Sequence, residues 1–403
     1  MNYCDFGKTG VQVSRLGLGA MRMPMIEKKG RKMVDEDKAM AVAHRAFELG
    51  VNYIDSAHVY LDGQCDGFVG RAVRAWKGGR IHVATKNPTW KLEKKGDYRR
   101  FLEEQLKNLG LGAIDFYHCH GLNGAQLDKV ILGLGVIDEI HKAKEEGLIR
   151  HASFSFHDKP AVMKRIIDTG VFESVLCQYN ILDQSNAKSI AYAARKGLGV
   201  VAMGPVGGGR LIPPEMRGEG TQKKAKEAKA SAKEGARNAK KPKAETATAT
   251  SAAKSPATPA QLALHYVLGN PGVHCALSGM STVQMVEENA AAASEGWRVT
   301  KREIDRFAKA IDDAKALAKL YCTGCEYCLP CPAGVNIPRC FEALIYARVW
   351  KVPGTAKFIW NQVVQNKQGP SLCTECGECE DKCPQKIQIR KQLKETAEVM
   401  SSM

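Results

Sequence analysis

Residues 37–55 read DKAMAVAHRAFELGVNYID, and this stretch contains the unit that decides the fold. Its apolar residues recur at helical spacing as far as Leu49, which predicts an amphipathic helix. Gly50 stands where a helix often ends in a left-handed cap residue, and the apolar run VNYID is short enough to be a buried strand. The stretch therefore predicts a helix, a glycine cap and a strand.

The same unit recurs along the first three hundred residues, with caps expected at Gly110, Gly147, Gly170 and Gly197. Similar apolar runs without a preceding cap complete a set of eight expected strands, at 13–19, 51–55, 80–86, 113–120, 148–155, 174–179, 198–203 and 272–278. Each crossover is long enough to contain a helix, so the strands should be parallel. We therefore expect an α/β fold, a closed (β/α)8 TIM barrel.

The crossover between residues 203 and 272 is much longer than the others, because it contains a basic, low-complexity insertion at 217–257. Eleven basic and four acidic residues between Arg217 and Pro259 give this segment a net +7 of the chain's +16. With almost no large apolar side chains, it should stay solvated. It is either an expendable loop or an arm for an acidic partner, and nucleic acid is not expected because its lysines have few aromatic neighbours.

The overall composition, 44% hydrophobic and 25% charged residues, is ordinary for a globular protein. No apolar run approaches the roughly 18 residues of a membrane span, and the N-terminus lacks the pattern of a secretory signal. We expect a cytoplasmic protein with reduced thiols. Its 14 cysteines then indicate metal binding rather than disulfides, because most lie in two tight runs after residue 320.

The two cysteine runs read CTGCEYCLPCP from Cys322 and CTECGECEDKCP from Cys373. The second has the full spacing of bacterial ferredoxins, whereas the first has two residues instead of three before its last cysteine. Zinc sites are built from separated cysteine pairs, which these runs do not resemble. The runs predict two 4Fe-4S clusters held by Cys322, Cys325, Cys328, Cys331, Cys373, Cys376, Cys379 and Cys383.

The ligands should cross between the runs, because in two-cluster ferredoxins the fourth cysteine of each run binds the other cluster. We expect one cluster on Cys322, Cys325, Cys328 and Cys383, and the other on Cys331, Cys373, Cys376 and Cys379. The segment between the runs has helical patterns, RCFEALIYARVW and AKFIWNQVV, so this part is similar to α-helical ferredoxin modules. The expected domains are the barrel at 1–315 and the two-cluster domain at 316–403. The remaining cysteines, Cys4, Cys65, Cys119, Cys177, Cys275 and Cys340, are expected to be packed thiols.

Four polar residues lie at or just beyond the ends of three consecutive expected strands, where barrel enzymes carry their catalytic groups. These are Asp55 and Tyr60 after the second strand, Lys86 after the third and His120 after the fourth. Singly, each has an ordinary structural explanation, such as a helix cap, a solvated charge or a satisfied core histidine. Together they form an acid device, in which Lys86, held by Asp55, lowers the pKa of Tyr60 from about 10 so that the phenol can protonate an alkoxide.

The chain resembles the aldo/keto reductase family, in the subgroup fused to a C-terminal ferredoxin domain. The resemblance rests on GKTGVQVSRLGLGAMRMP at the start and on IDSAHVY, VATKNP and IDFYHCHGL, and it covers essentially the whole chain. It implies a catalytic tetrad of Asp55, Tyr60, Lys86 and His120, with His118 at an apolar position of the family pattern. It also implies a nicotinamide cofactor, NADP or NAD, lying extended across the barrel mouth.

The resemblance further implies that Ser155 and Gln178 hold the nicotinamide carboxamide and that Glu288 and Asn289 bind the adenine. The complete set of implied cofactor contacts is Gly19, Met21, Ser155, Gln178, Met203, Gly204, Glu288 and Asn289. Four positions depart from the family pattern. Phe156 replaces an asparagine, Met203 replaces the aromatic residue that stacks on the nicotinamide, and Gly279 and Met285 replace the Lys and Arg that grip the 2′-phosphate. Specificity for NADP is therefore weakened.

Two functions remain open. The first is NAD(P)-dependent reduction of a small carbonyl compound, or oxidation of an alcohol, with Tyr60 as general acid and base. Its clusters are either structural or exchange electrons with a partner such as a ferredoxin or flavoprotein. The alternative is an electron-transfer iron-sulfur protein whose barrel is a docking scaffold. A hydride carries two electrons and a cluster passes one at a time, yet the sequence shows no flavin signature that would reconcile them.

Overall fold

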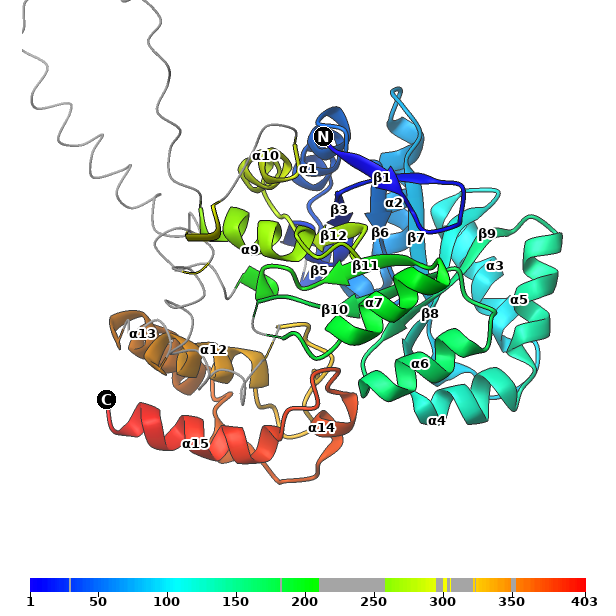
Figure 1. The fold of residues 1–403 in the computed structure, drawn as a ribbon. Helices are drawn as coiled ribbons and strands as arrows, with labels where there is room; N and C mark the ends of the chain where they lie inside the picture. The colour runs from blue at the N-terminus through cyan, green and yellow to red at the C-terminus, as the bar shows by residue number, and fades with distance from the viewer. Residues whose placement is uncertain are drawn as a thin grey trace, which may run out of the picture.

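The computed structural model describes residues 1–28, 30–181, 183–209, 258–294, 300–302, 305, 322, 324–348 and 353–403. Figure 1 shows a barrel of strands surrounded by helices, with a group of C-terminal helices beside it. The expected insertion at 217–257 and the expected domain boundary at residue 315 lie outside the described residues.

Eight parallel strands form a closed barrel in the order β3-β6-β7-β8-β9-β10-β11-β12. Their bounds are β3 Leu16–Gly19, β6 Tyr53–Asp55, β7 His82–Asn87, β8 Ile114–Leu122, β9 Ile149–Phe156, β10 Ser174–Gln178, β11 Gly199–Met203 and β12 Cys275–Ser278. Each overlaps one of the eight expected strands, so the predicted barrel is confirmed.

The outer layer of the barrel consists of helices that alternate with the strands (Figure 1). They are α1 Glu36–Glu48, α2 Cys65–Ala75, α3 Asp97–Leu109, α5 Val136–Glu145, α6 Pro160–Asp168, α7 Ala187–Lys196, α9 Pro259–Leu268 and α10 Val283–Ala292. Each buries one apolar face. In α1 the face includes Val42 and Phe47, and the side chain of Asp35 caps the helix by accepting from the Lys38 N–H.

The glycine caps expected from the sequence are present. Gly110 ends α3 with φ 62°, and its N–H bonds to the carbonyls of Leu106 and Lys107, as a left-handed cap requires. The other four expected caps also have positive φ values: Gly50, Gly147, Gly170 and Gly197. These caps turn the chain from each helix into the next strand.

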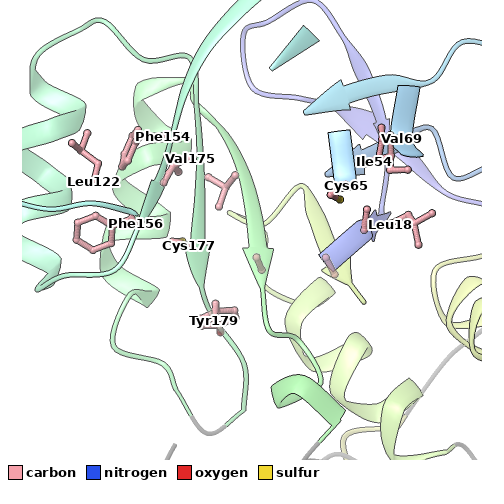
Figure 2. Close-up of a cluster of buried hydrophobic side chains, with 14 of the residues drawn as sticks. Leu18, Ile54, Cys65, Val69, Leu122, Phe154, Phe156, Val175, Cys177 and Tyr179 are labelled. Carbon is pink, nitrogen blue, oxygen red and sulfur yellow. The ribbon is translucent and has the colours of Figure 1, made fainter. Parts of the chain in front are cut away.

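Apolar side chains fill both the barrel interior and the layer between strands and helices. The hairpin of β1 (Tyr3–Asp5) and β2 (Gln12–Ser14) supplies Phe6 to the interior, where its ring meets that of Phe116 edge-on at 5.0 Å. Figure 2 shows Leu18 and Ile54 beside Cys65 of α2 in the outer layer. Cys65 is fully buried there, as expected of a packed thiol.

Shorter elements surround the barrel. They are the hairpin of β4 Met25–Lys28 and β5 Arg31–Val34, the 3-10 turns η1 Ala20–Arg22, η2 Tyr60–Gly63, η3 Thr89–Lys91 and η5 Gly207–Gly209, the short helix α4 Gly124–Gln126 and the π-helical η4 Leu127–Leu132. η1, η2 and η3 each follow the carboxyl end of a barrel strand, so they lie at the mouth.

The C-terminal helices pack on one another beside the barrel (Figure 1). They are α12 Ile337–Arg348, α13 Pro353–Gln365, η8 Pro370–Leu372, α14 Glu378–Lys382 and α15 Ile389–Ser401. Tyr346 of α12, Ile359 of α13 and Met400 of α15 share one buried cluster. The helical patterns expected between the cysteine runs are therefore confirmed. Within the described part of the chain, no helix has both the length and the apolar character needed to cross a membrane.

Candidate active site

The polar groups at the barrel mouth are positioned by the two-residue period of the strands. Tyr53 and Ala84 belong to the cluster that fills the barrel interior. Asp55 and Lys86 follow them by two residues on β6 and β7, so they point the same way, one layer nearer the mouth. On β8 the register partner of Lys86 is His118, and His120 lies two residues further along the strand, nearer the mouth. Three strands thus bring three of the four expected catalytic side chains to one place.

Asp55 and Lys86 form an ion pair that is almost completely buried, with the side chains 2% and 1% exposed. Lys86 Nζ donates to Asp55 Oδ1 at 2.5 Å and to the carbonyl oxygen of Ser56 at 2.6 Å. Burial raises the pKa of Asp55 although Lys86 acts in the opposite direction. A buried pair of this kind is costly to break, because each charge depends on the other for compensation.

Tyr60 lies directly above this pair, at the start of η2. The two residues after it, Leu61 and Asp62, have left-handed φ values of 53° and 54°, which gives a sharply turned loop. Lys86 Nζ is 4.6 Å from the centroid of the Tyr60 ring. The ammonium therefore contacts the face of the phenol ring, in a cation–π arrangement.

The expected lowering of the Tyr60 pKa is wrong for this structure. Burial raises the pKa of Tyr60 well above its usual value, and the nearby Asp55 carboxylate raises it further. Lys86 does not offset this effect because its ammonium donates to Asp55 and Ser56 and faces the ring rather than the hydroxyl. Tyr60 is therefore a protonated phenol at neutral pH.

His120, and not His118, reaches the mouth. His118 is completely buried, and its Nε2 lies 3.4 Å from the Tyr53 hydroxyl inside the barrel. His120 lines the cavity described below, with its ring 4.9 Å from that of Trp90 and 6.0 Å from that of Tyr60. Burial and the neighbouring Lys86 lower the pKa of His120 well below its usual value, so the ring is neutral.

Tyr327, from the first cysteine run, reaches into the barrel mouth. Its hydroxyl is 3.1 Å from His120 Nε2, and the Tyr327 side chain also acts on the pKa of the neighbouring Tyr60. A residue more than two hundred positions away in sequence therefore completes the surroundings of the tetrad. Tyr327 was not among the residues predicted from the sequence. The only signal for it was a large aromatic residue between two expected cluster ligands.

A cavity of about 1400 Å³ separates the barrel mouth from the C-terminal helices. Tyr60, His120 and Trp90 line it on the barrel side, and Cys325 and Tyr327 line it on the other. Trp90, which was also not predicted from the sequence, is 46% exposed. A small molecule in the cavity could therefore contact both the barrel and the C-terminal part of the protein.

The cysteines of the two runs surround two smaller cavities. One is lined by Cys322, Cys325, Cys328 and Cys383, and the other by Cys331, Cys373, Cys376 and Cys379 with Cys328 at its edge. The fourth cysteine of each run thus lies with the first three of the other run. A shell of Ile337, Phe341 and Ile387 around the first cavity gives it the apolar surroundings that clusters tolerate. These residues fit a cluster at each position.

The two cysteine loops have left-handed residues at two matching positions. Gly324 and Glu326 in the first have φ values of 64° and 64°, and Glu375 and Gly377 at the matching positions of the second have 58° and 87°. Both loops therefore wrap in the same way around their first three cysteines. Cys340 lies outside both linings and is fully buried, which fits a packed thiol. Four of the other five cysteines expected to be packed thiols are buried as well, Cys65, Cys119, Cys177 and Cys275, while Cys4 is partly exposed.

Comparison with known proteins matches residues 15–312 to the "Aldo/keto reductase family" and residues 321–388 to a "4Fe-4S dicluster domain". The chain belongs to the aldo/keto reductase family. This protein is thus a member of that family with a C-terminal 4Fe-4S dicluster domain, as expected from the sequence.

Relatives of this aldo/keto reductase match its barrel. L-galactose dehydrogenase of Arabidopsis thaliana is 28% identical over 302 residues, covering 72% of this chain and 87% of that protein. The uncharacterized oxidoreductase YqkF of Bacillus subtilis is 26% identical, covering 74% and 92%. The solved holo form of aldo-keto reductase AKR11C1 from Bacillus halodurans has a TM-score of 0.57 at 26% identity, covering 77% and 96%.

The nicotinamide contacts implied by the family resemblance lie at the carboxyl ends of the adjacent strands β9, β10 and β11 and of β3, which β12 separates from β11. Gly19 ends β3, Ser155 lies near the end of β9, and Gln178 and Met203 are paired partners at the ends of β10 and β11. The Ser155 hydroxyl accepts from the Gly121 N–H at 2.7 Å. These residues lie at the mouth end of strands on both sides of the barrel, which fits a group held across the mouth.

The remaining implied contacts lie in different parts of the barrel. Met21 lines the large cavity, and Gly204, with φ 64°, packs against the side chain of Gln178. On α10, Asn289 is buried and donates to the Ser278 hydroxyl at 3.1 Å, while Glu288 is partly exposed. The structure therefore brings Asn289 to the end of β12, while the Glu288 side chain bonds to Gln284 on the same helix.

Proposed function

We propose that this aldo/keto reductase reduces a small carbonyl compound, or oxidises the matching alcohol, with a nicotinamide cofactor and with Tyr60 as general acid and base. The observation that carries the proposal is that the Tyr60 and His120 rings meet, with centroids 6.0 Å apart, above the buried Lys86–Asp55 pair. Two groups that meet at one point can hold the single oxygen of a carbonyl substrate.

The protonation states support this chemistry. Burial keeps Tyr60 protonated, so that it can give its proton to the alkoxide that forms. Asp55 holds the Lys86 ammonium against the face of the Tyr60 ring, and this contact keeps the phenol in place at the mouth. Neutral His120 can donate a hydrogen bond to the same oxygen without losing its proton. In the direction of oxidation the same groups act in reverse.

Ser155, Gln178 and Met203 would hold the nicotinamide, with Gly19, Met21 and Gly204 beside them and Glu288 and Asn289 at the adenine. The cofactor, when bound, supplies the hydride. NADP and NAD both remain candidates because Gly279 and Met285 stand where the family grips the 2′-phosphate. The stem of Arg22 packs against Gly279, where a Cβ would lie 2.9 Å from Arg22 Cδ. Arg22 therefore brings a cation near this position, which was not predicted from the sequence.

We propose two 4Fe-4S clusters, with the crossed ligand sets expected from the sequence. The two cavities lined by these cysteine sets support the assignment. A redox partner, a ferredoxin or flavoprotein, would reach the second loop, where Cys376 is exposed. The alternative, an electron-transfer protein with little nicotinamide-dependent activity, is kept because the chain has a complete two-cluster ligand set. We further propose that the barrel ends near residue 315, between the two family matches.

The test is hydride transfer by anaerobically reconstituted holoprotein. NADPH and NADH are each mixed with small aldehydes, ketones and sugars, the last because one relative is named for L-galactose. We expect absorbance at 340 nm to fall with at least one substrate, and Tyr60→Phe to lower kcat by about 100-fold or more. Tyr192→Phe, a surface tyrosine bonded to Asp168, is the matched control. Cluster reduction without any nicotinamide oxidation would favour the electron-transfer alternative.

A further inference from the structure

Within the described part of the first cysteine loop, Tyr327 is the side chain that contacts His120 and lies next to Tyr60. It lies between Cys325 and Cys328, two expected ligands of the same cluster. Its hydroxyl is 3.1 Å from His120 Nε2, and the centroid of its ring lies 6.1 Å from that of the His120 ring, in an edge-on arrangement. The contact is therefore made by the polar atom as well as by the ring.

The hydroxyl of Tyr327 occupies the hydrogen-bonding site of His120 Nε2, next to Tyr60. If Tyr60 and His120 hold the oxygen of a carbonyl substrate, as proposed above, that oxygen must occupy the same site. Two oxygen atoms cannot share it, because hydrogen-bonded oxygens stay about 2.7 Å apart. A substrate can therefore bind productively only after the Tyr327 hydroxyl has left.

The neighbouring cavity provides room for this movement. Tyr327 itself lines the cavity of about 1400 Å³, together with Trp90 and Gln126 of the barrel. A change of side-chain rotamer can turn the ring into this space while Cys325 and Cys328 keep the backbone fixed. The ring then forms a wall of the substrate pocket on the side of the cluster.

The second cysteine loop contains the matching control position. Glu378 precedes the third cysteine of its run, as Tyr327 does in the first. It is paired with Lys382 at 3.3 Å, and both side chains are about half exposed, 53% and 46%. Equivalent backbone positions thus carry a side chain inserted into the barrel mouth in one loop and a solvated side chain in the other.

We propose that Tyr327 is a specificity-determining residue of the barrel's active site. In the substrate-free protein its hydroxyl holds the place of the substrate's oxygen, and a substrate binds by displacing it and then packs against its ring. This inference rests on the proposed function for the roles of Tyr60 and His120. Tyr327 thus connects the barrel's substrate site with the loop that would hold the cluster bound by Cys322, Cys325, Cys328 and Cys383.

The experiment compares Tyr327→Phe with Glu378→Gln in full-length holoprotein. Benzoate is the probe, because its carboxylate oxygen can accept from Tyr60 and His120, and its Kd is measured by calorimetry without nicotinamide. Tyr327→Phe keeps the ring and removes the competing hydroxyl, so we expect benzoate to bind about tenfold more tightly, the effect of roughly one hydrogen bond. Glu378→Gln should leave the Kd unchanged. Unchanged or weaker binding by Tyr327→Phe overturns the proposal.

A second measurement uses the wild-type protein and does not depend on how the variant folds. Saturating benzoate should displace Tyr327 and shift the EPR signal of the reduced cluster held by Cys322, Cys325, Cys328 and Cys383, while the other signal stays fixed. Absence of a shift contradicts the displacement. If Tyr327→Phe tightens benzoate binding but the wild type transfers no hydride, the proposed function fails and the Tyr327 assignment stands. If the wild type transfers hydride but Tyr327→Phe leaves benzoate binding unaffected, the proposed function stands and the Tyr327 assignment fails.

Discussion

The two cysteine loops have the same backbone turns but opposite surroundings. The first places Tyr327 against His120, whereas the second leaves Cys376 and Glu378 at the surface. The left-handed residues occur at the same positions in both loops, so the difference comes from the side chains between the ligands. An aromatic ring gains free energy by burial, while a carboxylate loses solvation. Ligand spacing thus sets the form of a loop, and the intervening residues decide where it docks.

The largest expected effect tests whether the two loops share their clusters. Cys383→Ala should lose the same EPR signal as Cys322→Ala, and Cys331→Ala the same signal as Cys376→Ala, because each fourth cysteine lies with the other run. Iron analysis of each variant should show about half the wild-type content, and loss of a cluster should also destabilise the helical part severely. If Cys383→Ala instead matches Cys376→Ala, each run binds its own cluster and the crossed assignment is wrong.

The next effect compares the buried Lys86, which lies near the first loop, with the exposed Lys382, which lies beside the second. Lys86→Met leaves Asp55 buried without a counter-charge, so we expect the free energy of unfolding to fall by about 3–5 kcal/mol. Lys382→Met breaks an exposed pair with Glu378 and should cost at most about 1 kcal/mol. Urea denaturation followed by circular dichroism measures both. Equal losses would show that the Lys86–Asp55 pair is not buried in solution.

The last effect, which is smaller for each residue than the loss of Lys86, concerns the histidines at and below the mouth, next to the first loop. Burial lowers the pKa of His118 to about 3 and of His157 to about 4, and that of His120 well below normal. Because the folded pKa values lie below the unfolded ones, their contribution to stability is complete above about pH 6.5 and is lost as the pH falls below it. Between pH 6 and 5, each of these histidines should lower the free energy of unfolding by about 1.4 kcal/mol per pH unit.

Urea titrations between pH 7.5 and 5 would show this slope, and His118→Gln should remove about one histidine's share of it. A stability that does not change over this range would contradict the neutral histidines. Since His120 stays neutral and Tyr60 stays protonated, kcat should also show no break near pH 6.5.

Most of the barrel could be predicted because its signals are local. Gly50 and Gly110 end helices through contacts within one turn, and the apolar runs after them are strands wherever they lie in the barrel. Asp55, Lys86 and His120 were found for the same reason, since a position at a strand's carboxyl end implies a place at the mouth. The pKa of Tyr60 could not be predicted in this way, because it depends on how deeply the hydroxyl is enclosed and on which atoms Lys86 contacts.

The sequence by itself determined the strands, their caps and the cysteine spacing, because each depends on residues a few positions apart. Tertiary structure alone decided that Tyr327 meets His120, that Arg22 lies beside Gly279 and that the first cysteine loop, rather than the second, faces the barrel. These contacts join segments distant in the chain. They arise from the packing of the helical domain against the barrel, whose geometry no local pattern of residues specifies.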